Sequence, residues 1–267
     1  MKAVSKVYNF LIFAFLYAPI IVMIVFSFNG IKSRAVFDGF SLQWYQELFK
    51  DTVIMKSLYT SLLLAVLAAV ISTIIGTLAA VGINASKGFR KRAYLAVNSI
   101  PMVNPEIVTA VSMMILFVFV ITKFNTLEMG FGTLLISHIT FCIPYVTLEV
   151  LPKIKGMDSN IYNAALDLGC PPAKAFLKVV IPQIKPGIIT GFIMAFTLSL
   201  DDFIISYFNS GSTVQTLSVT IFSMTKKPYS PKINALSTLL FVAILILLVT
   251  INILQSKNES KKKGVRK

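Results

Sequence analysis

The chain has 267 residues, of which 56% are hydrophobic and only 13% are charged, whereas about a quarter of the residues are charged in a typical soluble domain. This composition excludes an ordinary soluble domain and favours a protein that lies in a lipid bilayer. The net charge of +14 does not indicate a nucleic-acid partner, because the basic residues fall in short gaps between apolar runs rather than on one polar face.

Six apolar stretches are long enough to cross a bilayer, for which about 20 residues are needed. The predicted spans are residues 8–28, 58–83, 95–122, 131–152, 188–207 and 233–255. The first stretch is longer than the roughly 7–15 apolar residues of a cleavable signal peptide, so we expect it to remain as a membrane anchor. The sequence therefore predicts an all-α, polytopic membrane protein with a single transmembrane domain over residues 1–267.

The distribution of basic residues predicts how the chain is oriented. Six spans place both termini on one side, and Lys and Arg residues in short flanking loops accumulate on the cytoplasmic side. With both termini in the cytoplasm, 17 of the 25 Lys and Arg residues lie inside and 8 lie outside. We therefore expect cytoplasmic termini, with the basic tail 261–267 at the anionic inner leaflet.

The cytoplasmic loop 153–187, between the fourth and fifth spans, is predicted to hold two short helices. Asp158 and Ser159 are both favourable N-caps for the first helix, and Gly169 supplies the left-handed residue that ends it. Pro172 suits the first turn of the second helix, which we expect to stop before Pro182. The loop is thus expected to be an ordered element rather than a plain linker.

The first loop helix carries a small apolar stripe. Ile161, Ala164, Ala165 and Leu168 are spaced at i, i+3, i+4 and i+7, so they share one helix face. A stripe of this kind on a cytoplasmic segment needs a partner, which is either the protein's own helices or a separate protein. The sequence alone leaves both alternatives open.

Acidic residues inside the predicted spans are candidates for function, because an ionisable side chain is costly at bilayer depth and usually faces the interior of a helix bundle. Asp201 and Asp202 are adjacent and point about 100° apart on a helix, so we expect one to line a path while the other caps or pairs. Glu106 follows Pro101 and Pro105, which predict a broken helix, so its depth is either mid-membrane or near the inner face. These three carboxylates are the candidate substrate pathway, and pairing with a partner subunit is the alternative.

The remaining polar residues in the spans predict structure rather than catalysis. His138, the single histidine, lies with Thr140 in the fourth span, and we expect an interhelical hydrogen bond rather than a proton relay. Cys142 and Cys170 have neither a disulfide pattern nor a metal-ligand spacing and are interpreted as free thiols. The sequence contains no Gly-x-x-x-x-Gly-Lys-Ser/Thr, His-Glu-x-x-His or Gly-x-Ser-x-Gly motif, so we expect no enzymatic activity and no cofactor or metal bound by this chain.

The cytoplasmic loop resembles that of a known family. Asn163-Ala164-Ala165, Gly169 and Ile181-Pro182 are similar to the Glu-Ala-Ala…Gly…Ile-x-Leu-Pro loop of permeases of binding-protein-dependent ATP-binding-cassette (ABC) importers. The resemblance implies the MetI-like type I importer permease fold, in which this loop is the coupling helix that docks in a groove of the ATPase subunit. The implied ATPase-coupling residues are Asp158, Asn163, Ala164, Ala165, Asp167, Leu168, Gly169 and Pro172. Asn163 stands where the family has Glu, so a charge contact by that Glu is not carried over.

Three further segments resemble the polyamine permeases of this family, namely Ser137–Pro144, Phe196–Asp202 and Ser230–Leu236. The resemblance implies import of spermidine or putrescine across the inner membrane of a bacterium. It also implies a second homologous permease, two copies of an ATPase that hold ATP and Mg, and an external polyamine-binding protein. A polyamine is a chain of ammonium groups, and carboxylates at intervals would replace its lost water. The alternatives are a permease for another organic cation or a metal complex, an ion-coupled secondary transporter and, last, a membrane-embedded enzyme.

Overall fold

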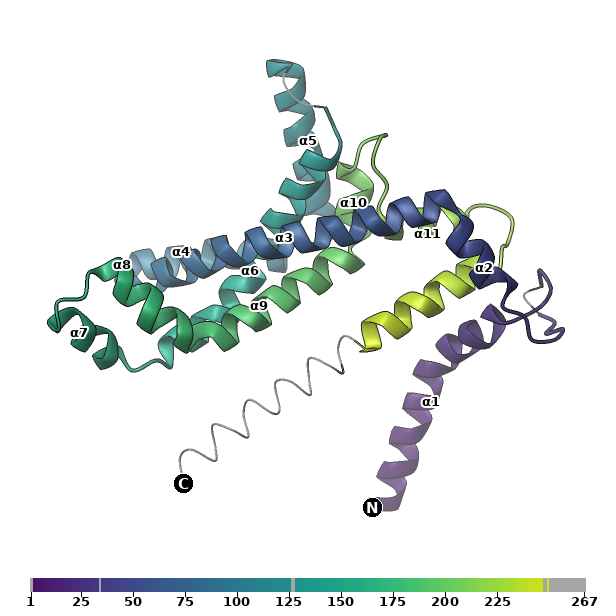
Figure 1. Ribbon diagram of the computed structural model, residues 1–267, viewed down its shortest axis with the longest axis horizontal. Helices are drawn as coiled ribbons and strands as arrows, with labels where there is room; N and C mark the ends of the chain where they lie inside the picture. The colour runs from purple at the N-terminus through teal and green to yellow at the C-terminus, as the bar shows by residue number, and fades with distance from the viewer. Residues whose placement is uncertain (1, 34, 126–127, 247–248, 250–267) are drawn as a thin grey trace. The chain divides into compact units, whose positions relative to one another are not determined.

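The computed structural model describes residues 2–33, 35–125, 128–246 and 249, and the regular secondary structure of this part of the chain is helical apart from one isolated bridge between Asn29 and Phe40. The helices are α1 (Lys2–Ser27), α2 (Gln43–Lys50), α3 (Thr52–Ala85), α4 (Gly88–Val103), α5 (Glu106–Phe124), α6 (Phe131–Lys155), α7 (Ser159–Asp167), α8 (Pro172–Ala175), η1 (Phe176–Val180), α9 (Ile181–Asp201), α10 (Ile204–Asn209) and α11 (Leu217–Thr225), followed by a helix over Lys232–Ile246 (Figure 1). The all-α prediction is confirmed.

Five of these helical segments are long and apolar enough to cross a bilayer, namely Lys6–Ser27, Thr52–Ala85, Glu106–Phe124, Phe131–Lys155 and Pro172–Asp201. The apolar helix Lys232–Ile246 stands at the sixth predicted span, and the rest of that span, apart from residue 249, lies outside the described residues together with the basic tail. The structure is therefore consistent with six spans. The chain divides into two compact units, Met1–Met55 with Ile221–Lys267 and Lys56–Thr220. The single-domain assignment stays a prediction.

The third apolar stretch is broken, as its prolines predict. Helix α4 ends at Val103 and α5 begins at Glu106. Asn104 adopts an extended conformation, with φ −67° and ψ 141°, which is the conformation favoured before a proline. Pro105 then precedes the first turn of α5, where its missing N–H costs nothing. Glu106 therefore lies at a helix N-terminus rather than in the middle of a span.

The expectation that the second loop helix stops before Pro182 is wrong. Helix α8 leads through the π-helical segment η1 directly into α9. The π-helical turn changes the hydrogen-bond register just before Pro182, and a proline in the first turn of a helix does not need an N–H donor. Residues Pro172–Asp201, which include the predicted second loop helix, are consequently one helical segment with a single change of hydrogen-bond register.

Close packing of α6 on α9 forms the core of the unit Lys56–Thr220. Four small residues at every fourth position of α9 are buried, namely Gly187, Gly191, Ala195 and Ser199. A Cβ on Gly191 would lie 3.1 Å from Val146 Cγ1, so the two backbones approach more closely than larger side chains allow. The Cys142 thiol donates to the Ala195 carbonyl at 3.5 Å. Such small-residue stripes let helices associate by packing where lipid offers no hydrophobic driving force.

Helix α3 packs on the same region of α6. Thr147 Oγ1 lies 3.3 Å from the Gly76 carbonyl and 2.9 Å from the Ile143 carbonyl, both within donating distance. A Cβ on Gly76 would lie 2.8 Å from both Cβ and Cγ1 of Val146. Gly76 is therefore required by the close approach of the two helices.

In the other unit, the segment after α1 is folded around a buried asparagine. The Asn29 side chain donates to the Val36 carbonyl at 2.7 Å and accepts from the Asp38 N–H at 2.8 Å, and Trp44 Nε1 donates to the Asn29 carbonyl at 2.6 Å. Lys232, at the start of the last described helix, pairs with Glu47 of α2 at 3.2 Å. These polar contacts order the segment between α1 and α2.

The α3–α6 contact predicts the effect of Gly76→Ala. The added methyl group has no room beside Val146, so we expect a loss of about 1–3 kcal/mol in the free energy of unfolding. Thermal unfolding of the purified protein in detergent measures it. Gly82→Ala on the same helix is the matched control, because a Cβ there meets nothing within 4 Å and the substitution should be neutral or stabilising. Equal stability of the two variants would contradict the close-packing argument.

Candidate functional site

Two helix breaks lie beside α6, and the candidate carboxylates are at these breaks. One break separates α4 from α5 before Glu106, and the other separates α9 from α10 at Asp202 and Phe203. Helix α10 contacts both α5 and α6, so the two breaks are brought together although about a hundred residues separate them in sequence. Their meeting point is the candidate site.

Asp202 is buried at the second break, one residue before Phe203, the N-cap of α10, and its side chain accepts hydrogen bonds from the first turn of that helix. Its Oδ1 accepts the Ile205 N–H at 3.1 Å, and its Oδ2 accepts the Ser206 N–H at 2.8 Å. The side chain is 1% exposed. Its carboxylate satisfies backbone donors that the start of a helix leaves without partners.

Asp201, by contrast, is exposed at the last residue of α9. Because the chain turns extended at Asp202, with φ −61° and ψ 129°, the two adjacent carboxylates lie in different environments. The expectation that one of them caps or pairs is confirmed for Asp202. The exposed Asp201 is the one that is accessible to a ligand in this chain.

Glu106 joins them from the other break. Its carboxyl group, which is partly exposed, is a hydrogen-bonding neighbour of Asp202 and also lies close enough to Asp201 for charge repulsion. Tyr145 of α6 lies close enough for its hydroxyl group to interact with the Glu106 charge. We call Glu106, Asp201 and Asp202 the acidic cluster. The structure thus brings all three sequence-predicted pathway residues to one place.

His138 is part of the same site. Its ring is fully buried, with Nδ1 2.8 Å from Ser199 Oγ of α9 and Nε2 3.4 Å from Asp202 Oδ2. The expected interhelical hydrogen bond is confirmed for His138 but not for Thr140, whose hydroxyl donates to Ile136 of its own helix at 2.8 Å. Sequence reasoning kept His138 apart from the acidic residues.

A helical spacing could have placed α6 against the site. His138, Cys142 and Tyr145 are at i, i+4 and i+7, so they share one face of α6. Cys142 is a buried free thiol that lies within electrostatic range of Asp202. The common face is the signal that sequence reasoning missed.

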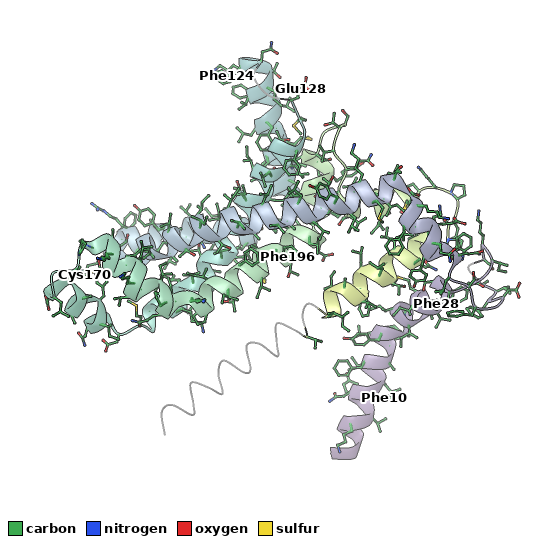
Figure 2. The ribbon with its side chains drawn as sticks, in the orientation of Figure 1. Phe10, Phe28, Phe124, Glu128, Cys170 and Phe196 are labelled. Carbon is green, nitrogen blue, oxygen red and sulfur yellow. The ribbon has the colours of Figure 1, made fainter. Side chains whose placement is uncertain are left out.

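The loop helix α7 has the ends that its sequence predicts. Asp158 is the N-cap and accepts the Asn160 N–H at 2.9 Å. Gly169 has φ +79°, its N–H donates to the Leu166 carbonyl at 2.8 Å, and the Cys170 N–H donates to the Ala165 carbonyl at 3.1 Å. This pair of bonds is a Schellman motif. Cys170 then lies in the loop before α8 (Figure 2).

The apolar stripe of α7 is largely exposed within its own unit. Leu168 is 88% exposed and Ile161 is 47% exposed, whereas Tyr162 packs against the core of the unit. Asn163 and Asp167 are also exposed, and Pro172 begins α8 as predicted. Within the described part of the unit Lys56–Thr220, the helices leave Ile161 and Leu168 of the stripe exposed.

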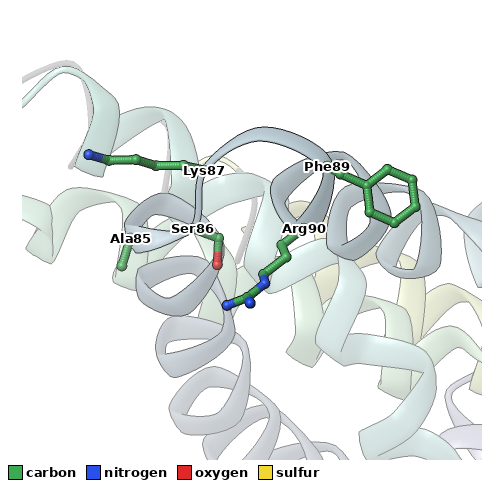
Figure 3. A pocket seen from close by; sticks show the side chains of 5 residues that line it. All are labelled: Ala85, Ser86, Lys87, Phe89 and Arg90. Carbon is green, nitrogen blue, oxygen red and sulfur yellow. The ribbon is translucent and has the colours of Figure 1, made fainter.

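A cavity of about 640 Å³ lies where α3 ends and α4 begins, lined by Ala85, Ser86, Lys87, Phe89 and Arg90. Figure 3 shows the Lys87 and Arg90 side chains pointing in different directions. The Ser86 hydroxyl donates to the Gly82 carbonyl at 2.8 Å. The cavity lies at the opposite end of the 16-residue α4, roughly 24 Å along the helix from the break before Glu106. It contributes no residue to the acidic cluster.

The chain is similar over most of its length to known transport proteins. Residues 72–261 match the family described as binding-protein-dependent transport system inner membrane component. The spermidine/putrescine transport system permease protein PotC of Haemophilus influenzae is 36% identical over 251 residues, which cover 94% of this chain and 96% of that protein. The putrescine transport system permease protein PotI of Escherichia coli is 36% identical over 234 residues, 87% of this chain and 83% of that protein.

Solved structures share the fold. A bacterial ABC transporter involved in the import of the acidic polysaccharide alginate has a TM-score of 0.73 at 14% identity, covering 94% of this chain and 95% of the other. An amino acid ABC transporter has a TM-score of 0.52 at 20% identity, covering 77% and 96%. These likenesses confirm the expected permease fold.

The capping of α7 can be tested by substitution. Asp158→Ala removes the acceptor for the Asn160 N–H, so we expect α7 to lose about 0.5–2 kcal/mol of local stability. Hydrogen exchange over residues 157–168 should then be faster. Asp158→Asn is the matched control, because asparagine caps about as well as aspartate, and its exchange should match that of the unaltered protein. Unchanged exchange in Asp158→Ala would show that the cap does not hold α7.

Proposed function

The chain belongs to the family of inner membrane components of binding-protein-dependent transport systems, the permease subunits of ABC importers, and on that premise we propose that its cargo is a polyamine. The observation that carries the proposal is the acidic cluster. Two carboxylates at helix breaks in apolar helices, with a third beside them, provide negative charge where a cation would have to leave water.

The chemistry of the cluster fits an organic cation. A polyamine alternates ammonium groups with short methylene segments, so it needs separated carboxylates together with apolar surface. Glu106 and Asp201 supply accessible carboxylates, and the partly exposed Tyr145 supplies an aromatic surface next to Glu106. Tyrosine faces also attract cations.

The fold alone does not indicate the charge of the cargo. The transporter with a TM-score of 0.73 imports an acidic polysaccharide, whereas PotC and PotI are named for polyamines. A cluster of carboxylates would repel an acidic cargo. The acidic cluster therefore supports the polyamine reading over an anionic cargo, and another organic cation or a metal complex remains the second candidate.

Transport of this kind needs partners that hydrolyse ATP and deliver cargo. We propose two copies of an ATPase that bind ATP and Mg, a second homologous permease and an external polyamine-binding protein. The exposed stripe of α7 supports docking to the ATPase, because Leu168 and Ile161 would otherwise face water. The coupling residues of this proposal are the eight that the resemblance implied, from Asp158 to Pro172.

The proposed orientation has both termini in the cytoplasm, which is supported by the excess of Lys and Arg in the loops on that side. It places α7 on the ATPase side of the membrane. Cargo would enter from the opposite side, meet the acidic cluster and leave to the cytoplasm. The acidic cluster then serves as a transient binding site for the cation along its path.

Uptake of labelled spermidine and putrescine tests the cargo. The complex of this permease with its partner subunits is placed in vesicles, and ATP-dependent uptake is compared with that of Glu106→Gln and Asp201→Asn. We expect uptake to require ATP and to fall about tenfold or more in each variant, because removing one partner of a desolvated cation costs at least about 1.4 kcal/mol.

Glu149→Gln is the matched control for the loss of a carboxylate. Glu149 is exposed on α6, three residues before Pro152, and does not belong to the acidic cluster. Its substitution should leave uptake near that of the unaltered protein. An assembled complex that hydrolyses ATP but imports neither polyamine would remove the polyamine proposal and leave the permease assignment intact.

Docking through α7 predicts that Leu168→Asp weakens binding of the ATPase. Leu168 would be buried in the groove, and losing that burial costs about 2–3 kcal/mol, or roughly 30- to 150-fold in affinity. Co-purification or a binding titration with the ATPase measures the change. Asn160→Asp is the control, because it adds the same charge to α7 about 100° around the helix from Ile161. Equal binding by both variants would contradict docking through the stripe.

A further inference from the structure

We propose that His138 is a positioning residue for cargo binding, which holds α9 and α10 together across their break and thereby fixes the acidic cluster. This inference rests on the proposed function, in which the cluster receives the cation. It assigns a transport role to a buried side chain that does not itself contact cargo.

The His138 ring bonds to both sides of the break. Nδ1 lies 2.8 Å from Ser199 Oγ, near the end of α9, and Nε2 lies 3.1 Å from Ser206 Oγ in α10. The ring is 0% exposed, so water cannot replace either contact without a rearrangement. One side chain of α6 therefore sets how α10 follows α9.

Asp202 is held in the same network. Nε2 of His138 lies 3.4 Å from Asp202 Oδ2, and the carboxylate also accepts two backbone N–H groups of α10. A carboxylate with these partners cannot turn towards a cation unless it uncaps α10. Asp202 thus adds negative charge to the site without contacting the cargo, while the exposed Asp201 and the partly exposed Glu106 are accessible for direct contacts.

Helix α10 links the His138 contacts to the helix that bears Glu106. Asn209 Nδ2 donates to the Ala110 carbonyl of α5 at 3.2 Å, and Ala110 is one helical turn after Glu106. Thr133 Oγ1 of α6 lies 2.9 Å from the Asn209 carbonyl. Glu106 itself is a hydrogen-bonding neighbour of Asp202. A continuous set of contacts therefore runs from His138 through α10 to the first turn of α5.

This geometry separates a positioning role from general stabilisation. If His138 only stabilised the bundle, its replacement would lower the amount of assembled complex but not the affinity of each complex for cargo. If it positions the cluster, the affinity must change while the complex still assembles. The two ring nitrogens also differ in what they hold, since Nδ1 faces Ser199 alone and Nε2 faces α10.

The test compares His138→Gln with His138→Asn in the full complex. The amide of glutamine reaches about as far as Nε2, and that of asparagine about as far as Nδ1, so glutamine alone can keep the contacts to α10. We expect the KM for ATP-dependent polyamine uptake to rise about tenfold or more in His138→Asn, because a buried hydrogen bond to a charged group is lost. It should stay within about threefold of the unaltered protein in His138→Gln, with ATP hydrolysis unchanged in both.

Thr140→Ala is the control on the same helix, because among the described residues its hydroxyl bonds to Ile136 of α6 alone, and KM should not change. Equal KM values for the glutamine and asparagine variants would overturn the proposal. If neither variant assembles, Ser206→Ala removes the contact from the α10 side, and an unchanged KM there overturns it equally.

A second measurement keeps this inference separate from the cargo assignment. If the unaltered complex imports no polyamine, the cargo assignment is refuted. Hydrogen exchange over residues 204–209 then tests directly whether His138 holds α10 in place. Faster exchange in His138→Asn than in His138→Gln supports the role of Nε2 in holding α10. Equal exchange in the two variants overturns it.

Discussion

Polar groups at a break in a membrane helix must find their partners inside the protein, because lipid offers none. Helix α9 breaks at Asp202, and the first N–H groups of α10 would be left without acceptors. The Asp202 carboxylate accepts two of them, and His138 from α6 lies against the same carboxylate. This group of hydrogen bonds makes the break tolerable, and the remaining features of the site are arranged around it.

Much of the fold could be predicted from the sequence because membrane helices leave strong signals. The length of the apolar stretches predicted the spans. Asp158 and Gly169 indicated the two ends of α7, and Pro105 indicated the break before Glu106. The stop before Pro182 failed because η1 changes the hydrogen-bond register there, and a π-helical turn has no sequence signature of its own.

The site was harder to predict because its parts meet through tertiary contacts. Nothing in the local sequence shows that the break at Asp202 packs beside the start of α5, which places Glu106 in the cluster. Nor does it show that His138 bonds to Ser199 and Ser206, which are about sixty residues away along the chain. The sequence did predict different roles for Asp201 and Asp202, but from the geometry of a continuous helix, whereas the structure separates the two carboxylates by the break at Asp202.

The arrangement also connects the loop 153–187 with the acidic cluster. Helix α6 runs from the His138 network to Lys155, just before α7, and α9 runs from η1 to Asp201. The small-residue stripe of α9 keeps these two helices in close contact along their length, from Gly187 beside Lys153 to Ser199 beside His138. Closely packed interiors move in discrete steps rather than deforming continuously. A displacement of α7 by a docked ATPase would therefore reach the break as a movement of the α6–α9 pair.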